Sequence, residues 1–348
     1  MKRGVSASEF IKELERLDRK QVDLIVPAAD MRLKDGLVAI KGESAEIRPG
    51  LIFHRQLAGA MGIPGRYYGR MLEETPDLLE RNVNTWLEMD DSTYMLRLFD
   101  LNGWMYGRAF LSDRYKRIDN LEVARYVLEQ TEGMRDDDSS EFWIPQNDSR
   151  IYMNIVSKNT EAQVVPGDFV RAGIVVSNSE VGDGAVTMAK LLFRLVCSNG
   201  MTIPEVDMIR RRRHIGGKVE AGLDRIAAKS GVSGLLEEHI NPAEAISGEW
   251  LSSVTRHISE HIWEPAEDAE DAVETVGLAI GLTESERELV LHQFEHDGDL
   301  TNYGLSNAIT KVAQVLESYD RSAYMQEAAW GVATMDERRW EEARCRKD

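Results

Sequence analysis

The spacing of apolar and polar residues predicts helices in the first quarter of the chain. Ser6 followed by Glu9 is the signature of a capping box, so a first helix is expected over residues 7–19. Apolar residues then recur at helical spacing over residues 57–71, where Pro64 and Gly65 interrupt the pattern. Pro76 opens a further helix that runs to residue 86.

From residue 93 the pattern changes to that of strands. Residues 94–100 and 104–111 flank Asn102-Gly103, the dipeptide most typical of a tight hairpin. A helix is expected over residues 121–130, and strands over 151–156 and 169–176. The leucines of segment 185–197 suit a helix, whereas its position after a glycine-rich turn suits a returning strand, and we favour the strand.

Helical spacing resumes over residues 219–229 and continues through most of the remaining chain. The whole pattern predicts an α+β fold, with an antiparallel β-meander core and packed helices, followed by an acidic all-helical C-terminal region. We expect two domains, an α+β core over residues 1–230 and an acidic helical domain over residues 231–348.

The composition is that of a folded protein in a reducing compartment. Of the 348 residues, 43% are hydrophobic and 29% are charged, a balance typical of globular chains. The two cysteines are Cys197 and Cys345, and the second lies in a charged tail, so no disulfide framework is expected. No uncharged stretch has the length of a membrane span or follows a signal-peptide pattern. These features predict a cytoplasmic protein with no membrane partner.

The formal net charge of −18 is unevenly distributed. Residues 231–348 hold 25 acidic against 9 basic side chains, while residues 1–230 hold 35 against 33. Because exposed charges are screened within about 10 Å at moderate salt, a local basic cluster in the first part keeps its own field. The net charge therefore does not exclude a nucleic-acid partner.

A run of four arginines is the most distinctive candidate binding site. Arginine stays charged and matches phosphate oxygens with a planar fork, and a glycine pair near a helix N-terminus lets backbone amides approach an anion. The cluster consists of Arg210, Arg211, Arg212, Arg213, His214 and, after Gly216-Gly217, Lys218. The competing interpretation is that these arginines pair with the acidic C-terminal region.

Two further segments place tyrosines between basic residues, which suits base stacking beside phosphate contacts. Their candidate residues are Tyr67 and Tyr68, between Arg66 and Arg70, and Arg114, Tyr115, Lys116 and Arg117. Tyrosines at helical spacing are also common as half-buried core residues.

Two H-x-x-E-H matches suggest a metal site. They pair His257 with His261 and His292 with His296, and histidines four apart share one face of a helix, with Glu260 or Glu295 as general base. No third ligand is evident, and a solvated helical face explains the pattern equally, so no metal is assigned. The sequence contains no phosphate loop, dinucleotide fingerprint or nucleophile elbow, and we assign no catalytic residue and no cofactor.

Several short stretches from residue 56 to 310 carry a resemblance to a known family: Gln56-Leu57, Gly62-Ile63-Pro64, Tyr67-Tyr68, Arg108 to Tyr115, Asn178-Ser179-Glu180, Arg194 to Met201, Arg212-Arg213-His214 with Gly216, and Asn307 to Thr310. Together they resemble phage/plasmid-like proteins that share a domain of unknown function, family 932. The resemblance implies a mobile-element context and no assigned activity. The predicted order of three strands and a helix is also similar to the core of single-strand annealing recombinases, which hold DNA in a basic groove and act as oligomers.

These observations lead to one principal hypothesis and two alternatives. We expect a non-enzymatic, homo-oligomeric protein that binds single-stranded DNA and promotes strand annealing. One alternative is a regulatory or host-interaction protein that binds a partner through its acidic C-terminal region. The other is a metal-dependent hydrolase built on the four histidines.

Overall fold

The computed structural model describes residues 4–144, 150–195, 199–203 and 241–345. The first part of the chain forms α1 (Ala7–Asp18), β1 (Gln21–Pro27), the short 3-10 helix η1 (Ala28–Asp30), β2 (Met31–Lys34), β3 (Leu37–Ile40), β4 (Ile47–Pro49), α2 (Leu51–Ala60), α3 (Gly65–Glu74), α4 (Pro76–Met89), β5 (Thr93–Asp100), β6 (Met105–Ser112) and α5 (Asn120–Gln130).

The second part forms β7 (Glu141–Trp143), β8 (Ile151–Gln163), β9 (Phe169–Asn178), β10 (Thr187–Arg194), β11 (Asn199–Ile203), α7 (Pro242–Ala245), α8 (Gly248–Glu260), α9 (Ala269–Ala279), α10 (Glu284–Asp297), α11 (Asn302–Ala313), α12 (Tyr319–Ala333) and α13 (Glu337–Arg344). This mixed architecture, with the strands in the first part and helices in the last, confirms the predicted α+β class.

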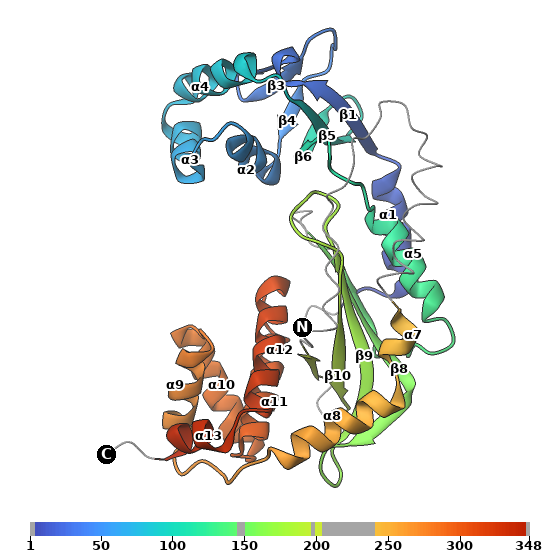
Figure 1. Ribbon diagram of the computed structural model, residues 1–348, viewed down its shortest axis with the longest axis vertical. Coiled ribbons are helices and arrows are strands. Elements are labelled where there is room, and N and C mark those ends of the chain that lie inside the picture. The colour runs from blue at the N-terminus through green and yellow to red at the C-terminus, as the bar shows by residue number, and fades with distance from the viewer. Residues whose placement is uncertain (1–3, 145–149, 196–198, 204–240, 346–348) are drawn as a thin grey trace.

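The first sheet has the order β1-β5-β6-β4-β3-β2, in which β4 and β6 run parallel and the other neighbours antiparallel. The β5–β6 hairpin turns at Asn102 (φ 58°) and Gly103 (φ 97°), the left-handed conformations that this dipeptide adopts most readily. Helices α2, α3 and α4 lie on one side of the sheet (Figure 1). The structure confirms the predicted hairpin. The sequence pattern does not predict strands β1 to β4.

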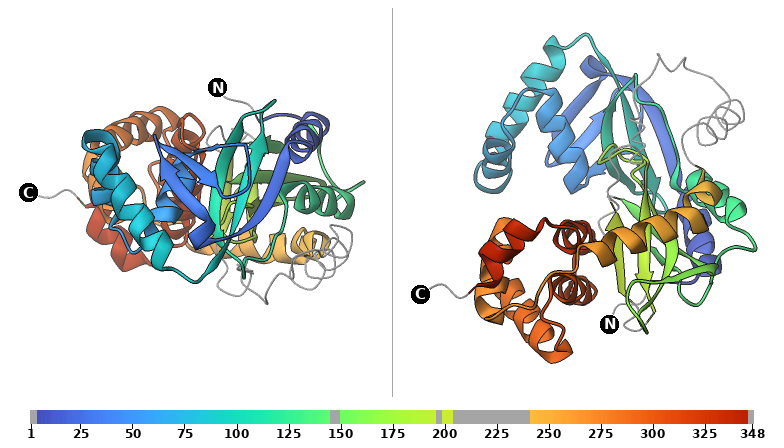
Figure 2. Two further views of the ribbon diagram at one scale, coloured as in Figure 1. Left: turned by 90° about the horizontal axis from the view of Figure 1, so that it is seen from above. Right: turned by 60° about the horizontal axis from the view of Figure 1, so that its bottom comes forward.

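The second sheet has the order β11-β10-β9-β8-β7, so neighbours in the sheet are also neighbours in the described sequence. All of its pairs are antiparallel. This arrangement confirms the predicted meander. It also confirms the strand in segment 185–197, because β10 pairs with β9 on one side and β11 on the other. The long helix α8 crosses one face of this sheet (Figure 2).

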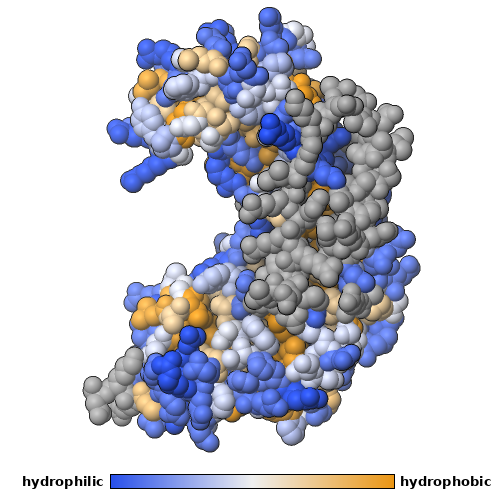
Figure 3. Space-filling view, in the orientation of Figure 1, coloured by the Kyte–Doolittle hydropathy of each residue, from blue (hydrophilic) through white to orange (hydrophobic). Residues whose placement is uncertain are grey.

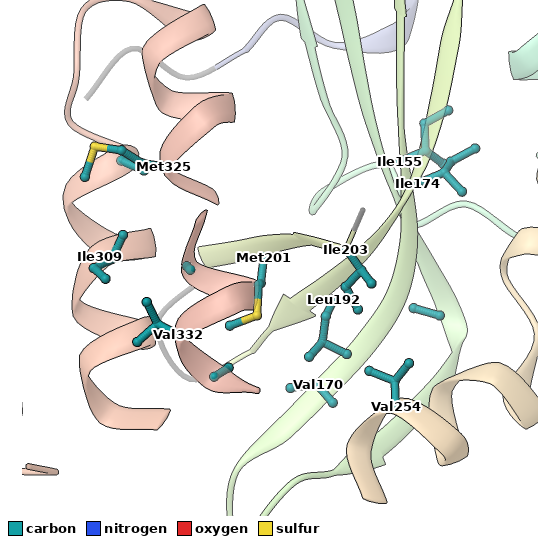
Figure 4. Close-up of a cluster of buried hydrophobic side chains, with 14 of the residues drawn as sticks. Ile155, Val170, Ile174, Leu192, Met201, Ile203, Val254, Ile309, Met325 and Val332 are labelled. Atoms are coloured by element: carbon teal, nitrogen blue, oxygen red, sulfur yellow. The ribbon is translucent and has the colours of Figure 1, made fainter. Parts of the chain in front are cut away.

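The buried apolar side chains form two large cores. One contains residues from Val26 to Phe110 and lies between the first sheet and its helices. The other contains residues from Phe10 to Ala343 and joins the second sheet to helices α8 to α13. In Figure 4, Met201 and Leu192 of the second sheet lie between Ile309 of α11 and Val254 of α8, and all four belong to this core. The expected domain boundary at residue 230 lies outside the described residues.

No helix in the described part of the chain combines the length and hydropathy that a membrane span requires.

The capping box at the start of α10 also connects α10 to α12. Its glutamate accepts hydrogen bonds from an arginine of α12. Thr283 and Glu286 cap α10 reciprocally, and both carboxylate oxygens of Glu286 accept bonds from Arg321 of α12, at 2.8 and 2.6 Å. These bonds from Arg321, followed by those from Thr283, lower the pKa of Glu286 to about 2 against the opposing effect of burial.

We expect Glu286→Gln to destabilise the protein by about 2 kcal/mol at pH 7, less than the pKa shift alone implies because Arg321 is partly exposed. A carboxyl whose pKa is depressed on folding stabilises the folded state above its unfolded pKa. The difference between wild type and variant should therefore shrink as the pH falls from 4.5 toward 2. Urea unfolding at several pH values measures it, and a difference that does not change with pH would contradict the assignment.

Candidate functional site

Helix α3 presents a face that carries two arginines and a tyrosine. Its sequence is GRYYGRMLEE, and Tyr68 and Met71 are buried against the first core. On the opposite face, Arg66 and Arg70 are exposed, and the side chain of Tyr67 between them is 46% exposed. Arg66 makes no ion pair with another described residue, whereas Arg70 pairs with Glu74 (2.9 Å) at the surface. We call Arg66, Tyr67 and Arg70 the α3 face.

The start of α3 leaves backbone donors free. Pro64 precedes the helix and makes no side-chain capping bond, and no acidic residue lies in the first turn. A β-carbon built on Gly65 or Gly69 would meet nothing within 4 Å, so the surface around both glycines is open. The partial positive charge of a helix N-terminus, beside Arg66, favours an anionic ligand here.

A hollow separates the lobe of the first sheet from the C-terminal helices (Figure 3). Helices α2 and α3 border it on one side, and α12 lies on the other (Figure 1). The two borders differ in charge, because residues 241–345 hold 22 acidic against 7 basic side chains. Residues 51–74 on the α3 border hold three basic against two acidic side chains, so a polyanion would be repelled less from this border than from the opposite one.

The three candidate tyrosines differ in their exposure to solvent. Only Tyr67 is exposed. Tyr68 is buried and its hydroxyl lies 2.8 Å from His54 Nδ1, and burial raises the pKa of Tyr68 and lowers that of His54. Tyr115 is also buried, and its hydroxyl donates to Ser179 O (3.2 Å). Tyr68 and Tyr115 present no ring face to solvent in this arrangement, so stacking stays a prediction for Tyr67 alone.

The basic candidates near Tyr115 also differ from one another. Arg114 is exposed, Lys116 is half-buried, and Arg117 donates from Nη1 to Asp23 Oδ2 (3.1 Å) at the edge of a buried cluster. The arginine run itself, with His214, Lys218 and the helix expected over residues 219–229, lies outside the described residues. Its segment follows β11, which ends at Ile203 and is an edge strand of the second sheet.

The candidate histidines form two pairs on different helices. The rings of His257 on α8 and of His261, the C-cap residue of α8, are 4.2 Å apart, and His261 Nδ1 lies 2.7 Å from the carbonyl oxygen of His257. On α10 the rings of His292 and His296 are 6.4 Å apart and nearly parallel. Across the described ranges, no three His, Cys, Asp or Glu residues form a group that could hold a metal ion. The structure thus gives no support to the hydrolase alternative.

A buried charge cluster, not foreseen from the sequence, lies where the two sheets meet. Arg97 of β5 is fully buried and bonds Asp23 (3.0 Å), Asp119 (2.6 Å) and the carbonyl oxygen of Glu180 (2.7 Å). Arg108 of β6 bonds the Glu180 carboxylate (2.5 Å). Burial alone would raise the pKa of Glu180, but Arg108 and Arg97 outweigh it and lower that pKa.

This charge cluster attaches the β9–β10 loop to the first sheet. The other Glu180 oxygen accepts from the backbone amide of Asn120 (2.8 Å), and Gln56 of α2 donates to Val181 O (2.7 Å). Arg55 of α2 pairs with Asp183 in the same loop. One sequence signal exists for the cluster: Arg97 and Arg108 each interrupt an otherwise apolar strand, which calls for a buried partner.

Three of the stretches that suggested a family resemblance meet at this cluster, and a fourth, which begins at Arg194, contributes to a second joint. Gln56, Arg108 and Glu180 belong to the first. At the second, Asp168 accepts from Arg194 Nε (2.6 Å) and from the hydroxyl of Tyr303 (2.8 Å), which ties α11 to the second sheet. These stretches therefore include residues that hold the halves of the fold together.

The comparisons with known proteins give a family but no activity. The family model described as Domain of unknown function (DUF932) matches residues 109–334, which is more than half of the chain. No curated protein and no solved structure matches the chain. The matched residues run from β6 through α12 and include the whole second sheet. The chain belongs to the DUF932 family.

Proposed function

We propose that the protein binds single-stranded DNA without catalysing a reaction, and that it promotes the annealing of complementary strands in the cytoplasm, as part of a phage or plasmid. The observation that carries this proposal is the α3 face, where an exposed tyrosine stands between two exposed arginines at the border of the hollow. The arginine run at residues 210–213 adds support from the sequence.

The chemistry of the α3 face suits a single strand. Residues four apart on a helix are neighbours about 6 Å apart along its axis, so Arg66 and Arg70 can contact successive phosphates. Tyr67 between them offers a ring on which an unpaired base can stack, a contact that contributes about 1–3 kcal/mol. Phosphate contacts and stacking leave the pairing edges of the bases free. A second strand can therefore pair with the bound one, which is what annealing requires.

The fold supports the annealing part by analogy. Strands β8, β9 and β10 are the three strands on which the similarity to annealing recombinases rests, and they are followed in the sequence by β11 and then by the arginine run. The helix expected after them lies outside the described residues. A shared architecture raises the expectation of a shared function without deciding it. The DNA-binding experiment below therefore precedes any annealing assay.

The test is fluorescence anisotropy of labelled single- and double-stranded oligonucleotides across a salt series. The double variant Arg66→Ala/Arg70→Ala should bind single strands at least tenfold more weakly, with a salt slope reduced by about 1.4, since each lost phosphate contact removes about 0.7. Tyr67→Ala should weaken binding without changing the slope. The fourfold change of Arg210 to Arg213 to Ala should reduce the slope by about 2.8 if all four contact phosphates.

The matched control is Arg338→Ala/Arg339→Ala, which removes two exposed arginines from α13. It lowers the net charge by the same amount as the α3 double variant but should leave the salt slope unchanged. Absence of binding by wild type at low salt would overturn the proposal. If the control weakens DNA binding and reduces the salt slope as much as the α3 variant does, binding depends on the net charge of the protein and not on the α3 face.

A second candidate, a protein-binding regulator, is favoured by the charge of the C-terminal helices. The 22 acidic side chains of residues 241–345, which include these helices, favour binding of a basic protein. This candidate would be favoured over the first by two results together. Wild type would not bind DNA, and it would retain basic host proteins at low salt but release them at high salt.

A further inference from the structure

Helix α4 has an apolar face that nothing in the described structure covers. Leu79, Val83 and Leu87 face the first core. On the other side of the helix, the exposed fractions are 37% for Leu78, 47% for Trp86 and 70% for Met89. The helix lies on the outside of the first lobe, away from the second sheet (Figures 1 and 2).

The helical repeat arranges this outer face in three rows. At 100° per residue, Leu78, Thr85 and Met89 form the central row. Trp86 lies on one flank, where its Nε1 donates to Asn82 Oδ1 (2.9 Å). Arg81 and Glu88 lie together on the other flank; both are exposed, and neither makes an ion pair with another residue of the described ranges.

We propose that α4 is the contact surface for a second copy of this chain, with the two α4 helices antiparallel about a two-fold axis that passes between residues 84 and 85. In such a pair, residues on the same flank face each other when their numbers are equally distant from the axis. Arg81 and Glu88 satisfy this condition, so each Arg81 meets Glu88 of the second copy.

The same register brings the apolar residues together. Trp86 lies near the axis and meets Trp86 of the second copy on the flank opposite the ion pairs. Met89 lies about 3 Å, measured along the helix axis, from Leu78 of the second copy. Opposite charges at matching positions, combined with matching apolar residues, make this face complementary to itself. This self-complementarity is the reason that the occupant is a second copy rather than an unrelated partner.

The test measures the mass of the intact protein by sedimentation equilibrium over a range of concentrations, without DNA, so it does not depend on the proposed DNA binding. Wild type should show a reversible monomer–dimer equilibrium. Arg81→Glu and Glu88→Arg should each weaken dimerisation at least about tenfold, because like charges then face each other. The double variant Arg81→Glu/Glu88→Arg should restore it.

The control Arg338→Glu changes an exposed charge on α13 and should leave the equilibrium unchanged. All three substituted positions are exposed, and circular dichroism checks that each variant keeps its fold. Wild type that remains monomeric at every concentration would overturn the proposal. So would single variants that dimerise like wild type, and failure of the double variant to recover would exclude this antiparallel register.

Discussion

Replacing Arg97 with methionine is expected to destabilise the protein by about 3–5 kcal/mol, because it removes the Arg97 ion pair of the largely buried Asp119 and leaves Asp23 paired with Arg117 alone. Arg97 is fully buried and binds Asp23, Asp119 and the carbonyl oxygen of Glu180. Methionine fills much of the same volume but donates no hydrogen bond. The measurement is the free energy of unfolding in urea, followed by tryptophan fluorescence.

The matched control for this prediction is Arg70→Met, an arginine whose ion pair with Glu74 is exposed. Exposed pairs contribute about 0–1 kcal/mol, so the control should remain close to wild type. A loss below about 1 kcal/mol for Arg97→Met would show that water or neighbouring groups compensate the buried carboxylates. The charge cluster would then not be what fastens the β9–β10 loop to the first sheet.

Trp340→Ala is expected to cost about 3–5 kcal/mol, the range for truncating a large aromatic side chain in a core. Trp340 is fully buried on α13, and its indole Nε1 donates to Glu264 O (2.7 Å). The substitution leaves a cavity and an unpaired carbonyl between α13 and the segment before α9. Thermal and urea unfolding both measure the loss.

Trp104→Ala serves as the control, since Trp104 is 61% exposed and the guanidinium of Arg48 lies over its ring, 5.5 Å from the centroid. Its removal should cost less than about 1 kcal/mol. Equal losses in the two variants would contradict the role given to α13, namely that it closes the second core.

The elements that the sequence predicts correctly are those determined by local chemistry. The capping box of Ser6 and Glu9 places the start of α1, and the structure shows both of its bonds. Asn102 and Gly103 adopt the positive φ angles that define the hairpin. The leucine content of segment 185–197 alone favours a helix. Its position after a glycine-rich turn is what predicts the strand.

The elements that the sequence does not reveal depend on distant contacts. Strands β2, β3 and β4 are three or four residues long, too short to show a period. β4 pairs in parallel with β6, almost sixty residues later in the chain, and no local pattern specifies such a pair. Tertiary packing therefore decides this half of the first sheet.

For the same reason, the sequence predicts only part of the candidate site. Basic residues beside tyrosines were visible in the sequence, but helical phase alone does not say that Tyr67 faces solvent while Tyr68 lies in the core. Arg97 and Arg108 appear in the sequence as isolated charges within apolar strands. Their partners come from β1, the segment before α5 and the β9–β10 loop, which the fold alone brings together.

The residues that make up the two cores determine which core can fold first during synthesis. The first core and the side chains packed against it come from residues 22–110, so this core can form while the rest of the chain is still being made. The second core includes Phe10 and Ala343, so it closes only after α13 has left the ribosome. Until then the apolar face of the meander lacks its cover, and the nascent chain is most exposed to aggregation or to capture by a chaperone in that interval.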